Sequence, residues 1–329
     1  MTNLENPARS TVPVTVLTGY LGAGKTTLLN HILSQEHGQK IAVIVNEFGE
    51  IGIDNQLVVS SDEEIFEMNN GCICCTVRGD LMRIIGNLMH RRDKFDRLVI
   101  ETTGLADPAP VIQTFFVDED VQLQTHLDAV VTVVDAKHIH LHWDAEEAQE
   151  QIAFADRILI NKTDLVTPAE LDELERKIRS MNAIAKIYRT QSARVDLDAI
   201  LGIGGFDLSH ALTIDPDFLG EEAHEHDESV GSIALVAPGT MNVEKVQEWL
   251  SKLLPTQGQN IFRMKGILNI HGQERRFVLQ GVHMIMDARL DRAWRADEER
   301  KNELVLIGRD LDEVELRQDF NNCLVLVDK

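Results

Sequence analysis

The chain has 329 residues, 43% of them hydrophobic and 26% charged, and its formal net charge at pH 7 is −22. This length favours two compact units, and the composition is that of an ordinary globular protein. The strongly negative charge argues against a nucleic-acid partner, because phosphate backbones require a basic surface, whereas an acidic surface either aids solubility or suits the handling of cations.

Short apolar segments alternate with helical patterns over the first two thirds of the chain. The continuous apolar run 41–46 is typical of a strand that is buried on both faces of a parallel sheet. The alternation predicts an α/β domain with a doubly wound, mainly parallel sheet and helices on both faces. The predicted strands are 12–18, 41–46, 97–100, 130–134 and 158–160, and the predicted helices are 26–35, 81–90, 110–116 and 168–181.

The pattern breaks down after residue 202, where Gly, Asp, Glu and His dominate. Such a composition is typical of a linker. Beyond it, strands follow one another with few helices between them, which predicts a smaller C-terminal α+β domain. We divide the chain into an N-terminal α/β domain (1–205), an acidic, His-containing linker (206–230) and the C-terminal domain (231–329). The predicted strands of the C-terminal domain are 232–237, 261–270, 276–282, 283–287 and 303–307, and its predicted helices are 243–254 and 311–320.

The segment after the first predicted strand contains a complete phosphate-binding loop (P-loop), Gly19-x-x-x-x-Gly24-Lys25-Thr26. Its position between a strand and a helix is the context that this motif requires. The glycines let backbone N–H groups surround the phosphates, Lys25 reaches the β- and γ-oxygens, and the Thr26 hydroxyl binds Mg²⁺. We predict nucleotide contacts at Gly19, Gly22, Ala23, Gly24, Lys25, Thr26 and Thr27, and catalytic roles for Lys25 and Thr26.

Asn161-Lys162-Thr163-Asp164 has the Asn-Lys-x-Asp form that recognises guanine. The Asp164 carboxylate accepts hydrogen bonds from guanine N1–H and the exocyclic amine, and the Lys162 stem covers the face of the base. A backbone N–H of Ser192-Ala193 supplies a donor to the guanine oxygen. These features predict GTP and GDP as ligands rather than ATP, with base contacts at Asn161, Lys162, Asp164, Ser192 and Ala193.

Glu101-Thr102-Thr103-Gly104 closes the predicted strand 97–100. Glu101 is a third predicted catalytic residue, which either holds a water bound to Mg²⁺ or orients the attacking water, while the Gly104 N–H contacts the γ-phosphate. No glutamine stands at the water-orienting place of Ras-like proteins, so we expect slow intrinsic hydrolysis. Asp135, after the strand 130–134, either faces the nucleotide or caps a helix, and we favour the cap.

Three of the four cysteines lie in Gly71-Cys72-Ile73-Cys74-Cys75, between the P-loop and Glu101. In P-loop switch proteins this part of the chain changes shape when the γ-phosphate leaves, so thiolates here predict a metal site coupled to the nucleotide. Thiolates favour Zn²⁺, Cu⁺ or Co²⁺ over Mg²⁺. The predicted metal ligands are Cys72, Cys74, Cys75, Glu47 and Glu50, with Thr26 on Mg²⁺.

Three thiols do not close a four-ligand zinc shell, which suits a labile site completed by a carboxylate or a partner. If the cysteine run is extended, Cys72 and Cys74 point to one side and Cys75 to the other. The alternative is that the cysteines are small buried residues of a tight turn. Glu47 and Glu50 are either ligands or solvated loop carboxylates.

The remaining histidines and cysteine carry weaker predictions. His138, His140 and His142 alternate, so in a strand they would share a face, and His224 and His226 lie in the acidic linker. Both stretches either collect metal loosely or are merely polar. Cys323 stands alone in an apolar segment, and we interpret it as a core residue.

Five motifs together resemble one known family: residues 19–27, Asn46-Glu47-Phe48-Gly49, the cysteine run, Glu101–Gly104 and the Asn-Lys-x-Asp loop. On these motifs the chain resembles the CobW family of P-loop GTPases, also described as zinc-regulated GTPase metalloprotein activators, and most of all its YjiA-like branch. The strand-rich C-terminal part resembles that family's C-terminal domain, so the resemblance covers nearly the whole chain.

The resemblance implies a GTPase that binds zinc, cobalt or a related metal through Cys-x-Cys-Cys and carries it to client metalloenzymes. Other branches are linked to cobalt handling in cobalamin synthesis and to the activation of nitrile hydratase. In the YjiA-like branch a glutamate two positions before Glu47 is associated with metal. This chain has Val45 there, whereas Glu50 and Cys74 remain available.

The first hypothesis is therefore a GTP-hydrolysing metallochaperone, and the second is a GTP-dependent regulatory module that senses redox state or metal. A nucleotide kinase is a third option, against which Asn-Lys-x-Asp argues. We expect client metalloenzymes as partners, a nucleotide- or metal-dependent homodimer by analogy, and neither nucleic acid nor membrane. The polar segment 2–10 and the lack of a long apolar run predict a cytoplasmic protein with reduced thiols.

Overall fold

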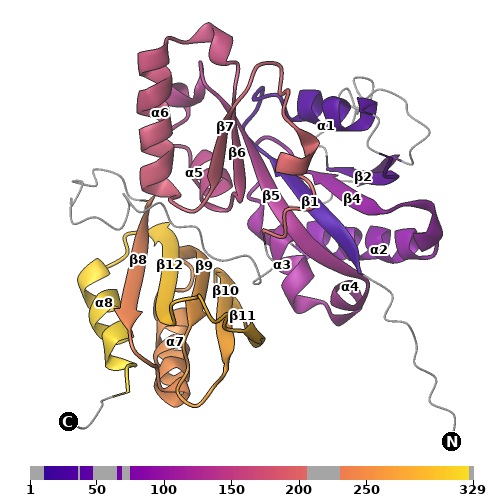
Figure 1. Cartoon of the computed structure of the whole chain (residues 1–329). Coiled ribbons are helices and arrows are strands. Elements are labelled where there is room, and N and C mark those ends of the chain that lie inside the picture. The colour runs from indigo at the N-terminus through magenta and orange to yellow at the C-terminus, as the bar shows by residue number, and fades with distance from the viewer. Residues whose placement is uncertain (1–10, 36–37, 47–64, 69–74, 206–229, 326–329) are drawn as a thin grey trace, which may run out of the picture.

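The computed structural model describes residues 11–35, 38–46, 65–68, 75–205 and 230–325. A parallel sheet forms the centre of the N-terminal domain, and a second, antiparallel sheet forms the C-terminal domain beside it (Figure 1). The predicted combination of a doubly wound α/β domain and a smaller α+β domain is confirmed. In the described part of the chain, no helix is long and apolar enough to cross a membrane.

The N-terminal sheet has seven strands in the order β3-β2-β4-β1-β5-β6-β7, and every neighbouring pair is parallel. The five inner strands are almost entirely buried and rich in Val, Ile and Leu, as expected for strands that are covered on both faces. The seven strands are β1 (Val12–Thr18), β2 (Ile41–Asn46), β3 (Ile65–Met68), β4 (Arg97–Glu101), β5 (Thr125–Asp135), β6 (Arg157–Asn161) and β7 (Lys186–Arg189).

Helices cover both faces of this sheet. On one face, α1 packs with residues 193–203 against alternate strand residues, and on the other face α2 to α6 pack against the remaining ones. The helices are α1 (Lys25–Ser34), α2 (Cys75–Met89), α3 (Ala109–Val117), α4 (Glu119–Gln124), α5 (Glu146–Ala153) and α6 (Pro168–Met181). Short 3₁₀ turns are η2 (Arg92–Lys94), η3 (Ile139–Leu141), η4 (Thr163–Leu165) and η5 (Leu197–Ala199).

Local signals define where several helices begin. The Thr167 side chain accepts a hydrogen bond from Glu170 N while the Glu170 side chain accepts one from Thr167 N, which is a capping box ahead of Pro168 in α6. Asp118 caps α4, and Asp312 caps α8 (Glu313–Asn322), each through a side-chain oxygen that accepts a hydrogen bond from a backbone N–H.

Several elements differ from the sequence-based prediction. The strands β3 and β7, of four residues each, were not predicted, and β5 begins five residues earlier than predicted. The helices α4 and α5 were also missed. Helix α2 begins at Cys75 rather than at residue 81, so the last cysteine of the run is helical and not extended.

The C-terminal domain is a five-stranded antiparallel sheet in the order β11-β10-β9-β12-β8. Helices α7 (Val243–Gln257) and α8 (Glu313–Asn322) pack on one face around Trp249, Leu250 and Phe320. The strands are β8 (Val230–Pro238), β9 (Ile261–Leu268), β10 (Arg275–Val282), β11 (Ile285–Ala293) and β12 (Lys301–Arg309). Residue 283 was predicted to open a strand, but His283 lies in the β10–β11 turn with a φ of 52°.

The opposite face of this sheet packs on the N-terminal domain. Phe262, Val282, Val305 and Ile307 belong to the same hydrophobic cluster as helices α2 to α6. Strand β8 begins at Val230, which we predicted as the last linker residue, and Val230 joins that shared cluster too. The two domains therefore share one apolar core.

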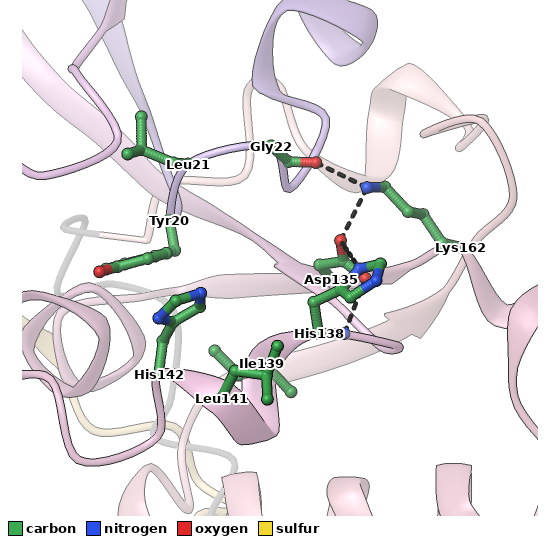
Figure 2. Close-up of a pocket in the computed structure, with 9 residues that line it drawn as sticks. All are labelled: Tyr20, Leu21, Gly22, Asp135, His138, Ile139, Leu141, His142 and Lys162. Atoms are coloured by element: carbon green, nitrogen blue, oxygen red, sulfur yellow. Dashed lines mark hydrogen bonds and ion pairs between the residues drawn. The ribbon is translucent and has the colours of Figure 1, made fainter.

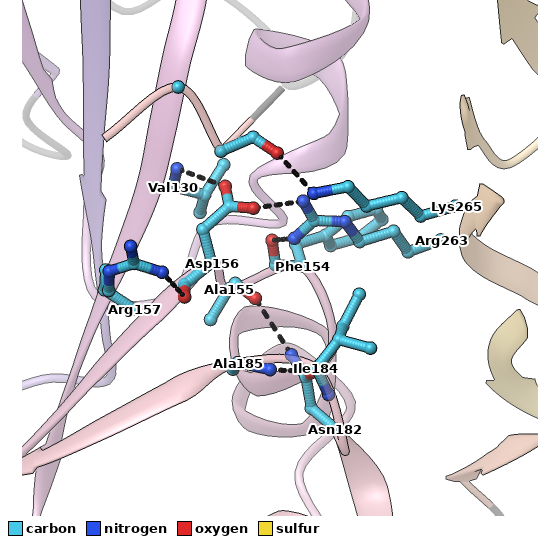
Figure 3. A network of polar contacts seen from close by, with 12 residues as sticks. Val130, Phe154, Ala155, Asp156, Arg157, Asn182, Ile184, Ala185, Arg263 and Lys265 are labelled. Carbon is cyan, nitrogen blue, oxygen red and sulfur yellow. Dashed lines mark hydrogen bonds and ion pairs between the residues drawn. The ribbon is translucent and has the colours of Figure 1, made fainter. Parts of the chain in front are cut away.

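Buried polar contacts reinforce this junction. Arg263 on β9 is 2% exposed, and its guanidinium donates to the Phe154 carbonyl at 2.7 Å and to the Asp156 carboxylate (Figure 3). Asp156 also accepts the Val130 N–H at 2.9 Å, and Lys265 donates to the Gly205 carbonyl at 2.8 Å. The C-terminal sheet is thus fixed to the loop that leads into β6.

Candidate functional site

The P-loop joins β1 to α1 at the carboxyl edge of the sheet. Gly19 and Gly24 have φ values of 140° and 112°, which a residue with a Cβ rarely adopts. A Cβ on Gly19 would lie 2.2 Å from the Val133 carbonyl oxygen, and one on Gly24 would lie 2.5 Å from Asn161 Nδ2. The loop therefore requires glycine at both positions, as the motif predicts.

The two predicted P-loop side chains lie at the start of α1. Lys25 Nζ donates to the carbonyl oxygens of Gly19 at 2.7 Å and Tyr20 at 3.3 Å, so it closes over the loop where phosphate oxygens would bind. Thr26 Oγ1 donates to Glu101 Oε1 at 3.1 Å, which joins the P-loop to the end of β4. Glu101 is 5% exposed.

These residues fit a nucleotide with Mg²⁺. A hydroxyl and a carboxylate in contact are oxygen donors of the kind that Mg²⁺ selects. Thr103 Oγ1, two residues after Glu101, is buried and has no hydrogen-bond partner among the described residues, so a polar group remains to be satisfied at this place. The structure thus places Lys25 and Thr26 at the start of α1 and bonds Thr26 to Glu101, while the catalytic roles of the three residues stay predictions.

The predicted guanine loop is bonded directly to the P-loop. Asn161 Nδ2 donates to the Ala23 carbonyl at 3.0 Å, and Lys162 Nζ donates to the Gly22 carbonyl at 2.7 Å (Figure 2). Lys162 has a φ of 61°, a left-handed conformation that turns the chain sharply at the end of β6. Asp164 lies in η4 and is exposed, so its carboxylate is accessible to a base.

The predicted donor to the guanine oxygen has a different partner in this structure. The Ala193 N–H donates to Asn161 Oδ1 at 2.8 Å, and Ala193 is fully buried. Its neighbour Ser192 is exposed, and both residues have left-handed φ values, 50° for Ser192 and 53° for Ala193. The segment therefore positions the Asn161 amide beside the P-loop.

Asp135 at the end of β5 bonds to the turn that follows it, but it is not the helix cap that we favoured. Its Oδ1 accepts the N–H groups of Lys137 at 2.9 Å and His138 at 3.2 Å, although the helix cap of η3 itself is His138. Its Oδ2 pairs with Lys162 at 2.7 Å. Burial opposes the charge, but the hydrogen bonds from Lys162 and His138 outweigh it and lower the pKa of Asp135. Asp135 therefore also orients the lysine of the guanine loop.

A cavity of about 270 Å³ lies on the outer side of the P-loop (Figure 2). Its wall includes the Tyr20 ring stacked on His142, with ring centroids 4.4 Å apart. Leu21 and Leu141 line the same cavity and are 59% and 63% exposed. The cavity adjoins the nucleotide site at Gly22 and Lys162.

The three alternating histidines do not lie on a strand. Residues 139–141 form the 3₁₀ turn η3. His138, just before this turn, contacts Asp135, whereas His142, just after it, stacks on Tyr20. In the ranges that the structure describes, no three His, Cys, Asp or Glu side chains converge to hold a metal ion. The three histidines therefore do not share the face of a strand, loose metal capture by this stretch stays a prediction, and His224 and His226 lie outside the described residues.

Most predicted cargo-metal ligands lie outside the described residues: Glu47, Glu50, Cys72 and Cys74. Cys75 is the first residue of α2, and only its backbone is described. The strands that precede these ligands are, however, well defined. Asn46, the residue before Glu47, pairs with Met68 at the end of β3, and Val45 pairs with Glu101 on β4.

Cys323 is the fourth cysteine, and its interpretation as a core residue is confirmed. It is 2% exposed and packs in the core of the C-terminal domain. Burial, with a smaller effect of the Asp319 charge, raises the pKa of its thiol to about 11.

One polar side chain that the sequence did not point to contacts the segment after Glu101. Gln151 on α5 is 1% exposed, and its Nε2 donates to the carbonyls of Gly104 at 3.2 Å and Ala106 at 3.1 Å. The next residue towards the N-terminus, Glu150, is also buried. Burial, followed by the charge of Asp107, raises the pKa of Glu150 to about 8.

The parallel sheet, the P-loop with Lys25 and Thr26, and the Asn-Lys-x-Asp loop bonded to it define a P-loop GTPase. Comparison with known proteins narrows the class. Residues 13–189 match the nucleotide-binding domain of CobW/HypB/UreG, and residues 230–324 match the cobalamin synthesis protein cobW C-terminal domain. The chain belongs to the CobW/HypB/UreG family, which confirms the resemblance seen in the motifs.

Curated relatives match over nearly the full length. The chain is 39% identical over 315 residues to the zinc chaperone YjiA of Escherichia coli (strain K12), which covers 94% of this chain and 98% of that protein. It is 33% identical over 346 residues to zinc-regulated GTPase metalloprotein activator 1 of Schizosaccharomyces pombe, which covers 92% of this chain and 84% of that protein.

Crystal structures of one of these relatives also match the chain over nearly its full length. The crystal structure of Zn(II)-bound YjiA GTPase from E. coli matches with a TM-score of 0.78 and 34% identity, covering 96% of this chain and 100% of that chain. A Zn(II)-bound triple mutant of YjiA, in which a glutamate and two consecutive cysteines are replaced by alanine, matches with the same values.

Proposed function

We propose that this protein is a GTP-hydrolysing zinc chaperone that delivers Zn²⁺, or a related transition metal such as Co²⁺, to client metalloproteins. Its relatives named zinc chaperone and zinc-regulated GTPase metalloprotein activator support this function. The observation that carries the proposal is the register of three neighbouring strands, which connects the nucleotide site to the segments with the predicted metal ligands.

In the proposed nucleotide site, each residue has one task. The Asp164 carboxylate accepts the N1–H and exocyclic amine of guanine, and Lys25 neutralises the β- and γ-phosphates. Thr26 and Glu101 would hold Mg²⁺ or its water, and bound Mg²⁺ would neutralise charge that develops on the transferred phosphoryl group. The N–H of Gly104 meets the γ-phosphate, so it distinguishes GTP from GDP.

The proposed link between nucleotide and cargo runs across the sheet. Glu101 on β4 lies beside Val45 on β2, and the next residue of β2, Asn46, lies beside Met68 on β3. The chain continues from Asn46 to Glu47 and Glu50, and from Met68 to the cysteine run. Carboxyl ends of parallel strands meet at one edge of a sheet, so a change at Glu101 is transmitted over two strand spacings of about 5 Å each.

The proposed cargo ligands are Cys72, Cys74 and Cys75, completed by Glu47 or Glu50. Thiolate and carboxylate together suit Zn²⁺, and a carboxylate in place of a fourth thiolate is a ligand that a client can replace when it takes the ion. The triple mutant of YjiA is Zn(II)-bound although two consecutive cysteines are replaced. The contribution of each ligand therefore has to be measured in the present chain.

Delivery requires that the ion be held more tightly in one nucleotide state than in the other. A nucleotide shifts a metal equilibrium only through such differential binding, and the linkage is reciprocal. Clients in the proposal are metalloproteins in general. By analogy with other P-loop proteins, a nucleotide- or metal-dependent homodimer is part of the proposal.

The decisive experiment measures Zn²⁺ affinity by competition with a chromogenic chelator, for the protein loaded with a non-hydrolysable GTP analogue and with GDP. We expect affinities that differ at least about tenfold, and a large loss in Cys72→Ser and Cys74→Ser. Cys323→Ser is the matched control, because that thiol is buried in the C-terminal core. Equal affinities in the two nucleotide states would contradict chaperone function and favour the regulatory module.

A further inference from the structure

The side-chain amide of Gln151 donates to backbone carbonyls of the segment that follows Glu101. Its Nε2 donates to Gly104 O at 3.2 Å and Ala106 O at 3.1 Å, while the side chain is 1% exposed. A buried amide that donates to two neighbouring carbonyls fixes the orientation of the peptide groups between them. The N–H of Gly104 lies in the peptide group between Thr103 and Gly104, which directly precedes the Gly104 carbonyl that Gln151 binds. The direction of this N–H is therefore restricted too.

The same segment is held from the other side by the P-loop. A Cβ on Gly104 would lie 2.7 Å from the backbone N of Leu21, so the two backbones are in direct contact. Gly104 is thus enclosed between the P-loop and Gln151. A hydrogen-bonding group on one side and close packing on the other leave this peptide little freedom to rotate.

Helix α5, which carries Gln151, has its carboxyl end fixed by buried donors. Thr132 Oγ1 donates to the Gln151 carbonyl at 2.6 Å, and Asn182 Nδ2 donates to Ile152 O at 2.8 Å. Arg263 from the C-terminal sheet donates to Phe154 O at 2.7 Å. These bonds satisfy carbonyls that the end of a helix leaves without intrahelical partners, and they make α5 a rigid support for Gln151.

We propose that Gln151 is a positioning residue for GTP hydrolysis, which holds Gly104 and Ala106 so that the Gly104 N–H is directed at the γ-phosphate. The inference rests on the role of Gly104 in the proposed function. Gln151 touches neither nucleotide nor metal in this arrangement. It acts through the backbone of Gly104, and it ties the γ-phosphate contact to a helix that the C-terminal domain supports.

Gln151→Met tests the inference, because methionine has a similar length but no N–H donor. The matched control is Gln149→Met on the same helix, since Gln149 is 7% exposed and its side chain has no described hydrogen bond to residues 101–107. Fluorescent analogues of GDP and of non-hydrolysable GTP report the two affinities, and phosphate release reports kcat and KM.

For Gln151→Met we expect kcat and the ratio of GTP-analogue to GDP affinity each to fall about tenfold, with GDP affinity unchanged, and no such change in Gln149→Met. Amide hydrogen exchange at residues 102–107 should accelerate in Gln151→Met alone. An equal loss of affinity for both nucleotides would show a merely structural role of Gln151 and overturn the inference. Unchanged kinetics would overturn it too. If Gln151→Met does not fold, Gln151→Asn keeps the amide and shortens its reach, and the same outcomes apply.

Gly104→Ala separates this inference from the proposed function. A Cβ at that position displaces the segment from Leu21, so the affinity ratio should fall in this variant as well. If Gly104→Ala discriminates GTP from GDP as well as wild type does, the role proposed for Gly104 fails. If Gly104→Ala loses the discrimination and folded Gln151→Met keeps it, only the inference about Gln151 fails.

Discussion

Arg263 and Asp156 form an ion pair across the two domains, with side chains that are 2% and 5% exposed (Figure 3). Asp156 precedes β6, whose end carries the guanine loop, and Arg263 lies in the middle of the C-terminal sheet. Removing two charges from water carries a large desolvation penalty, which only good geometry and further hydrogen bonds offset. The Phe154 carbonyl and the Val130 N–H supply those bonds.

This pair predicts that Arg263→Met strongly destabilises the protein, because it leaves the Asp156 carboxylate buried without its partner. We expect a loss of about 3–5 kcal/mol in the free energy of unfolding. Urea unfolding followed by tryptophan fluorescence measures it, since Trp143 lies in the first domain and Trp249 in the second. The control is Arg309→Met, which removes the more exposed interdomain pair with Glu146 and should cost under about 1 kcal/mol. Equal losses in the two variants would contradict the prediction.

The carboxyl of Glu150 predicts a dependence of stability on pH. Burial and then the charge of Asp107 raise its pKa to about 8, with Glu146 and Glu147 adding to the effect and Arg309 opposing it. In the unfolded chain glutamate titrates near about 4.3, so between these values the folded state binds a proton that the unfolded state has lost. The contribution to stability is therefore full below about pH 4 and is lost as the pH rises through about 8.

Glu150→Gln should remove this dependence. At pH 8 we expect the variant to be more stable than wild type, with a much smaller difference at pH 5. Thermal unfolding between pH 5 and pH 9 measures the two curves. Glu147→Gln, on the same helix, controls for the loss of one negative charge. Parallel curves for wild type and Glu150→Gln would show that Glu150 does not titrate in this range.

The exposed carboxylate of Asp164 predicts base specificity. In Asp164→Asn an amide NH₂ group replaces one carboxylate oxygen. Guanine therefore loses charge-assisted hydrogen bonds worth about 1.5–3 kcal/mol each. We expect at least about a hundredfold weaker GTP binding, and a gain in affinity for xanthosine triphosphate, whose oxygen can accept from the new NH₂ group. Titration with fluorescent nucleotides measures both values. Unchanged GTP affinity would mean that this loop does not recognise the base.

The buried thiol of Cys323 predicts selective chemical protection. A raised pKa of about 11 leaves little thiolate at pH 8, and the core excludes the reagent. Alkylation with iodoacetamide followed by peptide mass spectrometry should leave Cys323 unmodified in the native protein and modify it in denaturant. Rapid labelling of the native protein at Cys323 would show that the C-terminal core opens readily.

The sequence predicted the nucleotide site because its residues lie in short contiguous motifs with fixed chemistry. Lys25, Thr26 and Glu101 meet in the structure, and Asn161 and Lys162 contact the P-loop. The same reasoning failed for Gln151, whose partners are backbone carbonyls 47 and 45 residues away. Backbone acceptors leave no residue-type signal in a sequence.

Helix α5 was missed for a related reason. Its segment Glu146–Ala153 is rich in Glu and Gln, which suggests solvent, yet Gln149, Glu150 and Gln151 are all buried. The alternating histidines suggested a shared strand face that the structure does not have. The alternation would align three side chains on a strand, but it has no such effect in the 3₁₀ turn η3. Burial depends on tertiary contacts that periodicity does not record.

The strand order also separates the proposed site of GTP hydrolysis from the segment that carries the proposed metal ligands. The P-loop follows β1, in the middle of the seven strands, whereas the cysteine run follows β3, at the outer margin of the sheet. The proposed site of GTP hydrolysis therefore lies at the central strand of the sheet, whereas the segment that carries the proposed metal ligands leaves the sheet at its outermost strand.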